Sequence, residues 1–349
     1  MSSIPTGHHL AAILPSKGAR LEFTNVPTPT PGPNELLIEV KSIALNPVDW
    51  YQRDRGFLIT KYPAILGSDV AGTIISTGSS VTSEDFKPGT RVAAFASGFY
   101  ENGNIEYGSF QTHVLVPASA AVPLPDSISF NEGSLLPMAV ETTWAGWYSI
   151  GLARDTKYTA ADKKGLLVWG GASSVGSAAL QVAKLMGFTV YTTASEKHHE
   201  YLKKLGATRA FDYKNEGVVE QIIKAANEDG IAIQTAYNAA LGASEQCIEV
   251  LKEFKGDGVA KLASAARLPD NCPKVDGIEI KFVAPPTDLE GRIEHFHFVF
   301  NIWLKEKLAT GEFVPSPKIQ VIPGGLEAAN TGLDVLTKGV SGVKLVLEL

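Results

Sequence analysis

The segment Gly165–Gly187, GLLVWGGASSVGSAALQVAKLMG, decides the fold of this chain. It begins with the apolar run Leu166–Trp169, whose length suits one buried parallel strand. The small residues Gly170–Gly176 then predict a tight turn. Beyond this turn, apolar residues recur at a spacing that places them on one helical face: Val175, Ala178, Ala179, Val182, Ala183 and Met186. The segment therefore predicts a strand, a turn and an amphipathic helix in direct succession.

This succession predicts a site for the pyrophosphate of a dinucleotide. A turn at a helix start brings unpaired backbone N–H groups and the positive end of the helix to one point, which suits a phosphate. The turn is not a strict G-x-G-x-x-G motif, because Ser174 runs directly into Val175-Gly176. A turn selected only for close strand–helix packing is the alternative, and the strand–turn–helix context favours phosphate binding.

Composition narrows the class of protein. A chain of 349 residues can form two domains, and 44% hydrophobic with 19% charged residues is typical of a soluble globular protein. The net charge of −6, without a long basic run, argues against a nucleic-acid partner. No apolar stretch is long enough for a membrane span, and the first residues lack the features of a signal peptide. Two cysteines make no disulfide framework, so we expect a cytoplasmic protein.

The first third of the chain predicts a β-rich domain. In Glu35–Ala44, Ile38 and Val40 alternate with Glu39 and Lys41, as in a strand with one buried face. Further short strands are expected at 72–76, 91–95 and 110–116, separated by Gly- and Pro-containing turns. Many short strands of this kind favour a small closed or partly closed barrel. A helix is expected over 137–148, where the pattern changes.

From residue 165 to about 285, expected strands and helices alternate, which predicts a parallel, doubly wound sheet. After the first strand, strands are expected at 188–193, 210–213, 232–237, 258–263 and 278–283, with helices at 196–205, 218–227 and 243–254. The tail does not continue this alternation, since it predicts a long helix from 289, another at 326–338 and a strand at 343–347. We therefore expect one domain from 1–135 with 286–349, and a cofactor-binding domain over 136–285.

Taken together, these features resemble the medium-chain dehydrogenase/reductase superfamily over essentially the whole chain. Five segments carry the resemblance: Ala44–Asp49, Gly67–Gly72, Gly170–Gly176, Leu205–Ala207 and Val340–Val346. Within the superfamily, Asn46–Trp50 and the glycine turn resemble the zinc-independent quinone oxidoreductase-like branch, and most of all its fungal trans-acting enoyl reductases. The resemblance implies an α/β fold, with a β-rich GroES-like partial barrel domain and a Rossmann domain built on a doubly wound parallel sheet.

No metal site is predicted. Zinc-dependent members of the superfamily use a Cys and a His-Glu pair, whereas this chain has Asn46 and Ser68-Asp69 in those segments. No cysteine precedes Cys247, although zinc sites need a concentrated set of ligands. The seven histidines do not provide one: His8 and His9 fall in a stretch expected to be loose, His198 and His199 diverge on a helix, His295 and His297 share no helical face, and His113 is alone in a strand.

The cofactor is predicted to be NADP(H) rather than NAD(H). NAD-specific sites place an acid at the end of the second strand, and Thr193 occupies that position here. Ser195 and Lys197 follow, and a hydroxyl with an ammonium can hold a 2′-phosphate. An ordinary exposed Lys197 and an N-capping Ser195 are the alternative. The resemblance adds Tyr213 to the phosphate site. For the pyrophosphate, the turn itself offers Gly171, Ser173, Ser174 and Val175.

Without zinc, the predicted chemistry is direct hydride transfer to a conjugated carbonyl substrate, either a quinone or an enoyl compound. The resemblance places Asn46 and Asp49 near the nicotinamide and implies that Thr142 faces the cofactor. It also implies further cofactor contacts from Leu241, Val283 and Ser341. Tyr51 is either a donor to a substrate oxygen or part of surface packing, and no residue stands out as the proton donor.

Two other functions stay open at this point. One is an NADPH-binding structural or redox-sensing protein with little turnover, and the other is an alcohol or aldehyde dehydrogenase with an unrecognised metal arrangement. The chain is expected to be a monomer or a homodimer. If a sheet edge is used for dimerisation, the strand 278–283 is the expected edge, and Lys281 would protect it in a monomer.

Overall fold

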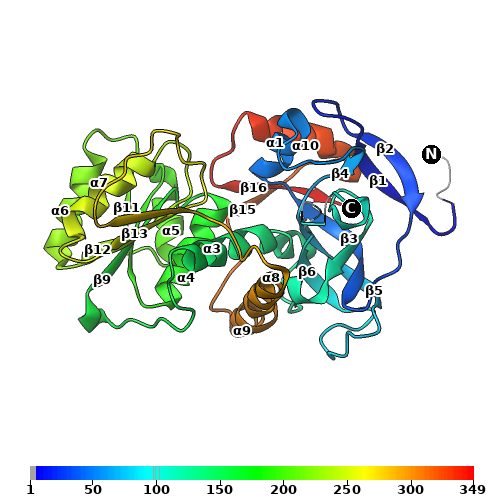
Figure 1. Cartoon of the computed structure of the whole chain (residues 1–349), viewed down its shortest axis with the longest axis horizontal. Helices are drawn as coiled ribbons and strands as arrows, with labels where there is room; N and C mark the ends of the chain where they lie inside the picture. The colour runs from blue at the N-terminus through cyan, green and yellow to red at the C-terminus, as the bar shows by residue number, and fades with distance from the viewer. Residues whose placement is uncertain (1–4, 97, 99, 102) are drawn as a thin grey trace. The chain divides into compact units, whose positions relative to one another are not determined.

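The computed structural model describes residues 5–349 except 97, 99 and 102, and the chain forms two compact units (Figure 1). The first unit contains the chain up to residue 138 together with 296–311 and 318–349, and the second contains 139–295 and 312–317. The second unit therefore includes ten residues beyond the expected end at 285, and a short return segment besides. Within the described part of the chain, no helix has both the length and the apolarity to span a membrane.

The first unit contains two β-sheets. The small sheet has the strand order β2-β1-β4 and the large mixed sheet has the order β15-β16-β3-β5-β6-β8, with β7 also paired to β3. The strands are β1 (His8–Leu14), β2 (Glu22–Pro27), β3 (Glu35–Ala44), β4 (Ala64–Ile65), β5 (Asp69–Thr77), β6 (Arg91–Phe95), β7 (His113–Pro117), β8 (Ala121–Pro123), β15 (Lys318–Val321) and β16 (Val343–Glu348). Strand β3 has the predicted bounds and is central, because it pairs with β5, β7 and β16. Residues on both of its faces are buried, whereas the alternation predicted one buried face.

The start of the described chain is ordered, so the expectation of a loose segment around His8 and His9 is wrong. Strand β1 begins at His8 and pairs with β2 over six residues. His9 is 1% exposed, and its Nε2 lies 2.8 Å from Gln111 Oε1. Burial lowers the pKa of His9, which favours the neutral ring that a buried position tolerates. A histidine with a polar partner at each ring nitrogen can thus occupy an inward position of a strand.

The second unit is a six-stranded parallel sheet in the order β11-β10-β9-β12-β13-β14. Its strands are β9 (Lys164–Trp169), β10 (Thr189–Thr193), β11 (Arg209–Phe211), β12 (Ala232–Asn238), β13 (Ala260–Ser264) and β14 (Ile278–Phe282). The chain enters at the centre with β9, moves outward to β11, and then crosses to build the other half from β12. This is the doubly wound order predicted from the sequence, with β14 as the expected edge.

Helices cover both faces of this sheet, with α4 and α5 on one side and α6 and α7 on the other (Figure 1). The helices of the second unit's core are α3 (Pro137–Ser149), α4 (Ser174–Leu185), α5 (His199–Leu205), α6 (Val218–Asp229) and α7 (Ser244–Phe254). The remaining helices are α1 (Pro47–Arg55), α2 (Phe130–Gly133), α8 (Leu289–Phe296), α9 (Lys305–Thr310) and α10 (Ala329–Thr337). The apolar run expected as part of a long helix is a π-helix, His297–Leu304, between α8 and α9.

Helix α4 is buried on more than its apolar face. Ser177 and Gln181, which lie outside the apolar stripe, are 0% and 3% exposed. The return segment 312–317 covers them: Gln181 Nε2 donates to Val314 O at 3.1 Å, and Ser316 Oγ donates to Ser177 Oγ at 2.8 Å. The amphipathic pattern predicted the helix correctly, but this polar side contacts protein instead of water.

Candidate active site

In the turn after β9, the backbone at Gly171 and Gly176 packs so closely against neighbouring atoms that side chains would not fit. Gly170 has a φ of +86°, a region that favours glycine. A Cβ at Gly171 would lie 2.1 Å from Thr192 Oγ1, and one at Gly176 would lie 2.2 Å from Gly170 O. Ser173 caps α4, because its Oγ accepts a hydrogen bond from Gly176 N at 3.0 Å. The glycines are therefore required by the packing of the strand against the helix, and the turn is tight.

The same turn fits a pyrophosphate. The first backbone N–H groups of α4 have no carbonyl one turn earlier, and the helix dipole adds a partial positive charge there. Ser174 is the first residue of α4, and its Oγ is buried without a hydrogen-bond partner among the described residues. A hydroxyl group without a partner can donate a hydrogen bond to a phosphate oxygen. The predicted residues Gly171, Ser173, Ser174 and Val175 thus lie together at one helix start.

The residues predicted to select the cofactor lie at the carboxyl end of the sheet. Thr193 is paired with Phe211 on the parallel neighbour strand, so Ser195 and Tyr213 each lie two residues beyond the paired ends. Ser195 is half-buried, Lys197 is exposed and Tyr213 is 48% exposed. The structure places these residues at the same edge of the sheet, and their role in phosphate binding stays a prediction.

Thr193 is turned toward the glycine turn. Its Oγ1 accepts a hydrogen bond from Gly170 N at 3.1 Å, and its carbonyl accepts one from Gly171 N at 2.9 Å. The side chain that replaces the acid of NAD-specific sites is therefore fully buried and engaged in holding the turn. It offers no carboxylate that would repel a 2′-phosphate.

The predicted nicotinamide contacts of the second unit lie on three different elements. Thr142 is in the middle of α3, and its carbonyl accepts a hydrogen bond from the Tyr237 hydroxyl at 2.7 Å. Leu241 is 69% exposed in the loop after β12, and Val283 is 9% exposed directly after β14. Both loops leave the carboxyl ends of parallel strands, where ligands bind in such sheets. Their cofactor contacts stay predictions.

The first unit contains the other predicted residues. Ser341 is exposed in the turn before β16. Tyr51 lies on α1 in an aromatic group, with its ring centroid 3.9 Å from that of Trp50 and the Arg55 guanidinium 5.1 Å away. These contacts hold the Tyr51 ring in place, and donation to a substrate stays a prediction.

Asn46 and Asp49 belong to a buried polar cluster. Asn46 precedes α1, and its backbone N–H donates to Asp49 Oδ2 at 2.7 Å. Asn46 Nδ2 donates to Asp69 Oδ2 at 2.8 Å, and Lys344 Nζ donates to Asn46 Oδ1 at 2.5 Å. Asp69 Oδ1 accepts a further hydrogen bond from Met138 N at 2.6 Å. The structure thus brings the two predicted residues together, and adds Asp69 and Lys344 to them.

Asp49 is the electrostatically unusual member of this cluster. It is 0% exposed, and its Oδ1 has no hydrogen-bond partner among the described residues. Burial raises the pKa of Asp49 to about 7; the hydrogen bond from Asn46 and the nearby Lys344 oppose the rise, while the Asp69 carboxylate adds to it. Asp49 therefore holds a proton over a much wider pH range than an ordinary aspartate.

A second buried titratable pair was not predicted from the sequence. Glu141 of α3 and His295 of α8 are 4% and 1% exposed, with Glu141 Oε1 3.9 Å from His295 Nε2. Burial raises the pKa of Glu141 to about 8 and lowers that of His295 to about 4. Both side chains are therefore neutral near pH 7, and the contact is not an ion pair. The sequence feature that could have indicated this pair is Glu141, the single acid in the otherwise largely apolar sequence of α3.

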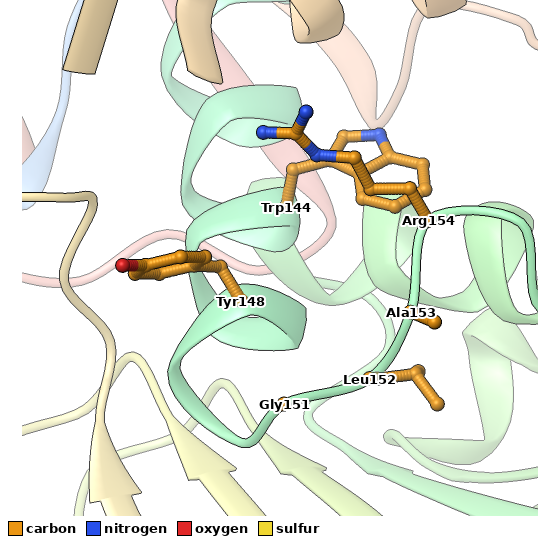
Figure 2. A pocket seen from close by; sticks show the side chains of 6 residues that line it. All are labelled: Trp144, Tyr148, Gly151, Leu152, Ala153 and Arg154. Carbon is orange, nitrogen blue, oxygen red and sulfur yellow. The ribbon is translucent and has the colours of Figure 1, made fainter. Parts of the chain in front are cut away.

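A surface hollow of about 310 Å³ lies beyond this pair at the end of α3 (Figure 2). It is lined by Trp144, Tyr148 and residues 151–154. Figure 2 shows the Tyr148 hydroxyl directed away from Trp144 and Arg154. The Tyr148 ring contacts His295 edge-on at 5.9 Å between centroids. A second hollow is lined by residues of α6 and α7 together with Gly217, and none of the predicted site residues lines it.

Comparison with known proteins identifies the family. Residues 32–126 match the family model described as alcohol dehydrogenase GroES-like domain, and residues 174–259 match that described as zinc-binding dehydrogenase. The trans-enoyl reductase tndF of Aspergillus flavipes is 48% identical over 342 residues, which cover 98% of this chain and 99% of the relative. The chain belongs to the medium-chain dehydrogenase/reductase superfamily.

Other members of the medium-chain dehydrogenase/reductase superfamily agree with this assignment. The trans-enoyl reductase tazE of Aspergillus terreus is 50% identical over 81% of this chain and 94% of its own length. The quinone oxidoreductase of Coxiella burnetii has the same fold, with a TM-score of 0.72 and 24% identity over 98% of this chain and 99% of that structure. The predicted family and fold class are confirmed, and the chain is an oxidoreductase of a family that binds a nicotinamide cofactor.

Proposed function

We propose that this protein is an NADPH-dependent reductase that transfers hydride, without a metal ion, to a conjugated carbonyl compound. An enoyl substrate is favoured over a quinone, because the relatives that are 48% and 50% identical are named trans-enoyl reductases. The observation on which the proposal depends is the glycine turn at α4, which fits a pyrophosphate and retains an unpartnered Ser174 hydroxyl.

When bound, NADPH supplies the hydride. The residues of the chain bind and orient it: the turn and the start of α4 hold the pyrophosphate, while Ser195, Lys197 and Tyr213 hold the 2′-phosphate. Thr142, Leu241 and Val283 are proposed to line the nicotinamide pocket, with Ser341 as a further contact. A conjugated substrate needs little polarisation, because its carbonyl oxygen receives the charge that develops.

A catalytic zinc ion does not fit the residues of the first unit. At the corresponding segments the side chains are Asn46, Ser68 and Asp69, whereas zinc prefers thiolate and imidazole ligands. No group of three or more His, Cys, Asp or Glu side chains within the described ranges is placed to hold a metal. The proposed reaction therefore uses no Lewis acid from the protein, despite the description of the matching family model.

The structure also supplies candidates for the proton that reduction of an enoyl compound requires. Asp49 and Glu141 are both buried carboxyl groups with raised pKa values, and each is protonated in part or wholly at pH 7. We propose Asp49 as the first candidate, because it lies in the Asn46–Asp49 segment that the superfamily resemblance places near the nicotinamide. Its Asp49→Asn variant is expected to lower kcat more than it changes KM.

The test is a matrix of substrates and cofactors. An enoyl thioester, an enone, an enal and a quinone are each incubated with NADPH or NADH, and the loss of reduced-nicotinamide absorbance is followed. We expect turnover with NADPH, highest with the enoyl thioester, and little with NADH. An alcohol with NADP⁺ serves as the comparison for dehydrogenase activity.

Two results would contradict this proposal. NADPH binding without turnover of any conjugated substrate would favour a structural or sensing role. Oxidation of the alcohol, with loss of that activity after chelation, would identify a metal-dependent dehydrogenase.

A further inference from the structure

We propose that the ammonium group of Lys344 is the resident cation of the first unit, and that it excludes a divalent metal ion from the space between Asn46 and Asp69. This inference deepens the metal-free part of the proposed function. It concerns a residue that lies 298 positions from Asn46 in the sequence.

The register of three adjacent strands brings the side chains together. Ala44 at the end of β3 is paired on one side with Asp69 of β5 and on the other with Val346 of β16. Lys344 lies two residues before Val346, and therefore points to the same face of the sheet. The chain continues two residues past Ala44 to reach Asn46. The junction of β16, β3 and β5 thus places an amide, a carboxylate and an ammonium side by side.

Contacts at this junction are those of a bound cation. Lys344 Nζ lies 2.5 Å from Asn46 Oδ1 and 3.1 Å from Asp69 Oδ2. The side chains of Lys344 and Asp69 are 4% and 0% exposed, so water contributes little to either charge. A buried charge requires a partner and hydrogen bonds to be tolerated. For Lys344, Asp69 Oδ2 is the charged partner and Asn46 Oδ1 accepts the hydrogen bond.

Other polar groups of the junction bind the two oxygens of Asp69. Asp69 Oδ1 accepts from Met138 N, and Asp69 Oδ2 also accepts from Asn46 Nδ2. Asp49 is the remaining acid of the cluster. Because the ammonium already neutralises Asp69 and occupies the Asn46 oxygen, a divalent cation would find its two oxygen ligands engaged. Lys344 also fixes the amide orientation of Asn46, whose backbone N–H binds Asp49.

The first experiment is a double-mutant cycle on the full chain, read as thermal unfolding. Lys344→Met removes the charge but retains the length of the side chain, and is expected to lower Tm by about 10 °C, because it leaves a buried carboxylate unpaired. Asp69→Asn in the Lys344→Met background is expected to restore at least half of that loss. Lys318→Met is the control, since Lys318 is an exposed lysine of the adjacent strand β15. Additive losses from the two substitutions would overturn the pairing.

The second experiment measures metal binding directly. Lys344→Ala opens the ammonium position while leaving both oxygen ligands, and hard cations prefer oxygen ligands. Millimolar Mn²⁺ is expected to raise the Tm of this variant by several degrees, reversibly with EDTA, and to leave the unmodified protein and Lys318→Ala unchanged. Stoichiometric metal in the purified unmodified protein, or no response of Lys344→Ala to Mn²⁺, would overturn the exclusion of metal.

These measurements do not depend on turnover. If they give the expected results while no conjugated carbonyl is reduced, the proposed function fails and the role of Lys344 stands. If NADPH-dependent reduction is found but the cycle is additive, the role of Lys344 fails and the proposed function stands. If Lys344→Ala does not fold, the cycle with Lys344→Met still decides the pairing.

Discussion

Thr193 illustrates how one residue serves both the structure and the expected selectivity of the cofactor site. Its hydroxyl and carbonyl bind the N–H groups of Gly170 and Gly171, so the end of β10 holds the glycine turn in place. Since the side chain is buried in this role, the proposed recognition of the 2′-phosphate would rest on Ser195, Lys197 and Tyr213. A small hydroxyl residue can bind the Gly170 N–H, and unlike an acid it places no carboxylate beside the proposed 2′-phosphate site.

Removal of the proposed phosphate ligands should separate the two cofactors. In Ser195→Ala with Lys197→Ala, the Kd for NADPH is expected to rise about 10- to 100-fold, because hydrogen bonds to a charged group contribute roughly 1.5–3 kcal/mol. The Kd for NADH should change little. Lys204→Ala, which replaces an exposed lysine of α5, is the control. Isothermal titration checks this, and equal losses for both cofactors would refute the assignment of NADPH.

Glu141 should make stability depend on pH. Burial raises its pKa to about 8, above the ordinary value of 4.5, so the folded chain retains a proton that the unfolded chain releases between these values. The free energy of unfolding should therefore fall as pH rises through this window, by up to about 1.4 kcal/mol per pH unit from this group. Urea unfolding of Glu141→Gln across this range should show a smaller slope.

The control for this slope is Glu290→Gln, which replaces an exposed acid on α8. Asp49 adds a slope of the same sign up to about pH 7, and it is present in both proteins. The difference between Glu141→Gln and the unmodified chain therefore isolates Glu141. An unchanged slope in Glu141→Gln would show that Glu141 is ionised in the folded protein.

At the scale of elements, α4 shows how a helix can be buried beyond its apolar stripe. The return segment 312–317 satisfies Gln181 on both its amide oxygen and its nitrogen, at distances of 3.0–3.2 Å. The helix that presents the phosphate turn is thus fixed by the sheet through its apolar face and by this segment through its polar residues. Such fixation preserves the position of the N-terminal amides on which the proposed pyrophosphate binding depends.

Gln181→Ala should accordingly destabilise the second unit. It removes the Gln181 partner of the Val314 backbone N–H and C=O, while Ser316 Oγ keeps its hydrogen bond to Ser177. Each backbone group left unsatisfied costs about 1–3 kcal/mol. Lys224→Ala on the exposed face of α6 removes only a surface contact and should cost less than 1 kcal/mol. Chemical denaturation measures both, and equal effects would mean that the segment contributes nothing to α4.

For the molecule as a whole, each of the two units contributes a different part of the proposed active site. The parallel sheet provides the cofactor turn and the loops at its carboxyl ends, while the mixed sheet provides the buried cluster around Asn46 and Lys344. Each arrangement depends on long-range strand pairing within its own unit. Binding of a nucleotide should therefore be visible as stabilisation of the folded chain.

At a free NADPH concentration of 100 times Kd, the free energy of unfolding should rise by about 2.7 kcal/mol. Gly171→Ala should abolish this gain, because the added Cβ would overlap Thr192 Oγ1 and displace the turn. Adenosine, added at the concentration used for NADPH, is the control for non-specific effects. A gain that persists in Gly171→Ala would place the nucleotide elsewhere.

Local pattern was sufficient for most elements. The alternation in Glu35–Ala44 predicted β3, and the apolar run followed by small residues predicted β9, its turn and α4, because periodicity and glycine placement report backbone conformation directly. The doubly wound order followed from the alternation of strands and helices. The glycine turn was singled out from its strand–turn–helix context and the Asn46–Asp49 segment from the superfamily resemblance, and the functional roles of both stay predictions. Local pattern did not reveal α1, β1 or the π-helix, since their signals are short or mixed.

What only the tertiary structure decided is which polar side chains share a buried space. Lys344 occurs in an ordinary strand sequence, and nothing local connects it with Asn46 or Asp69, although the resemblance had placed Asn46 and Asp69 in the segments of one zinc site. Strand register places them within hydrogen-bond distance, and burial then makes their charges matter. The same holds for Glu141 and His295. The sequence specifies where each backbone segment bends and which face is apolar, whereas the charge state of a buried group depends on neighbours that only long-range packing supplies.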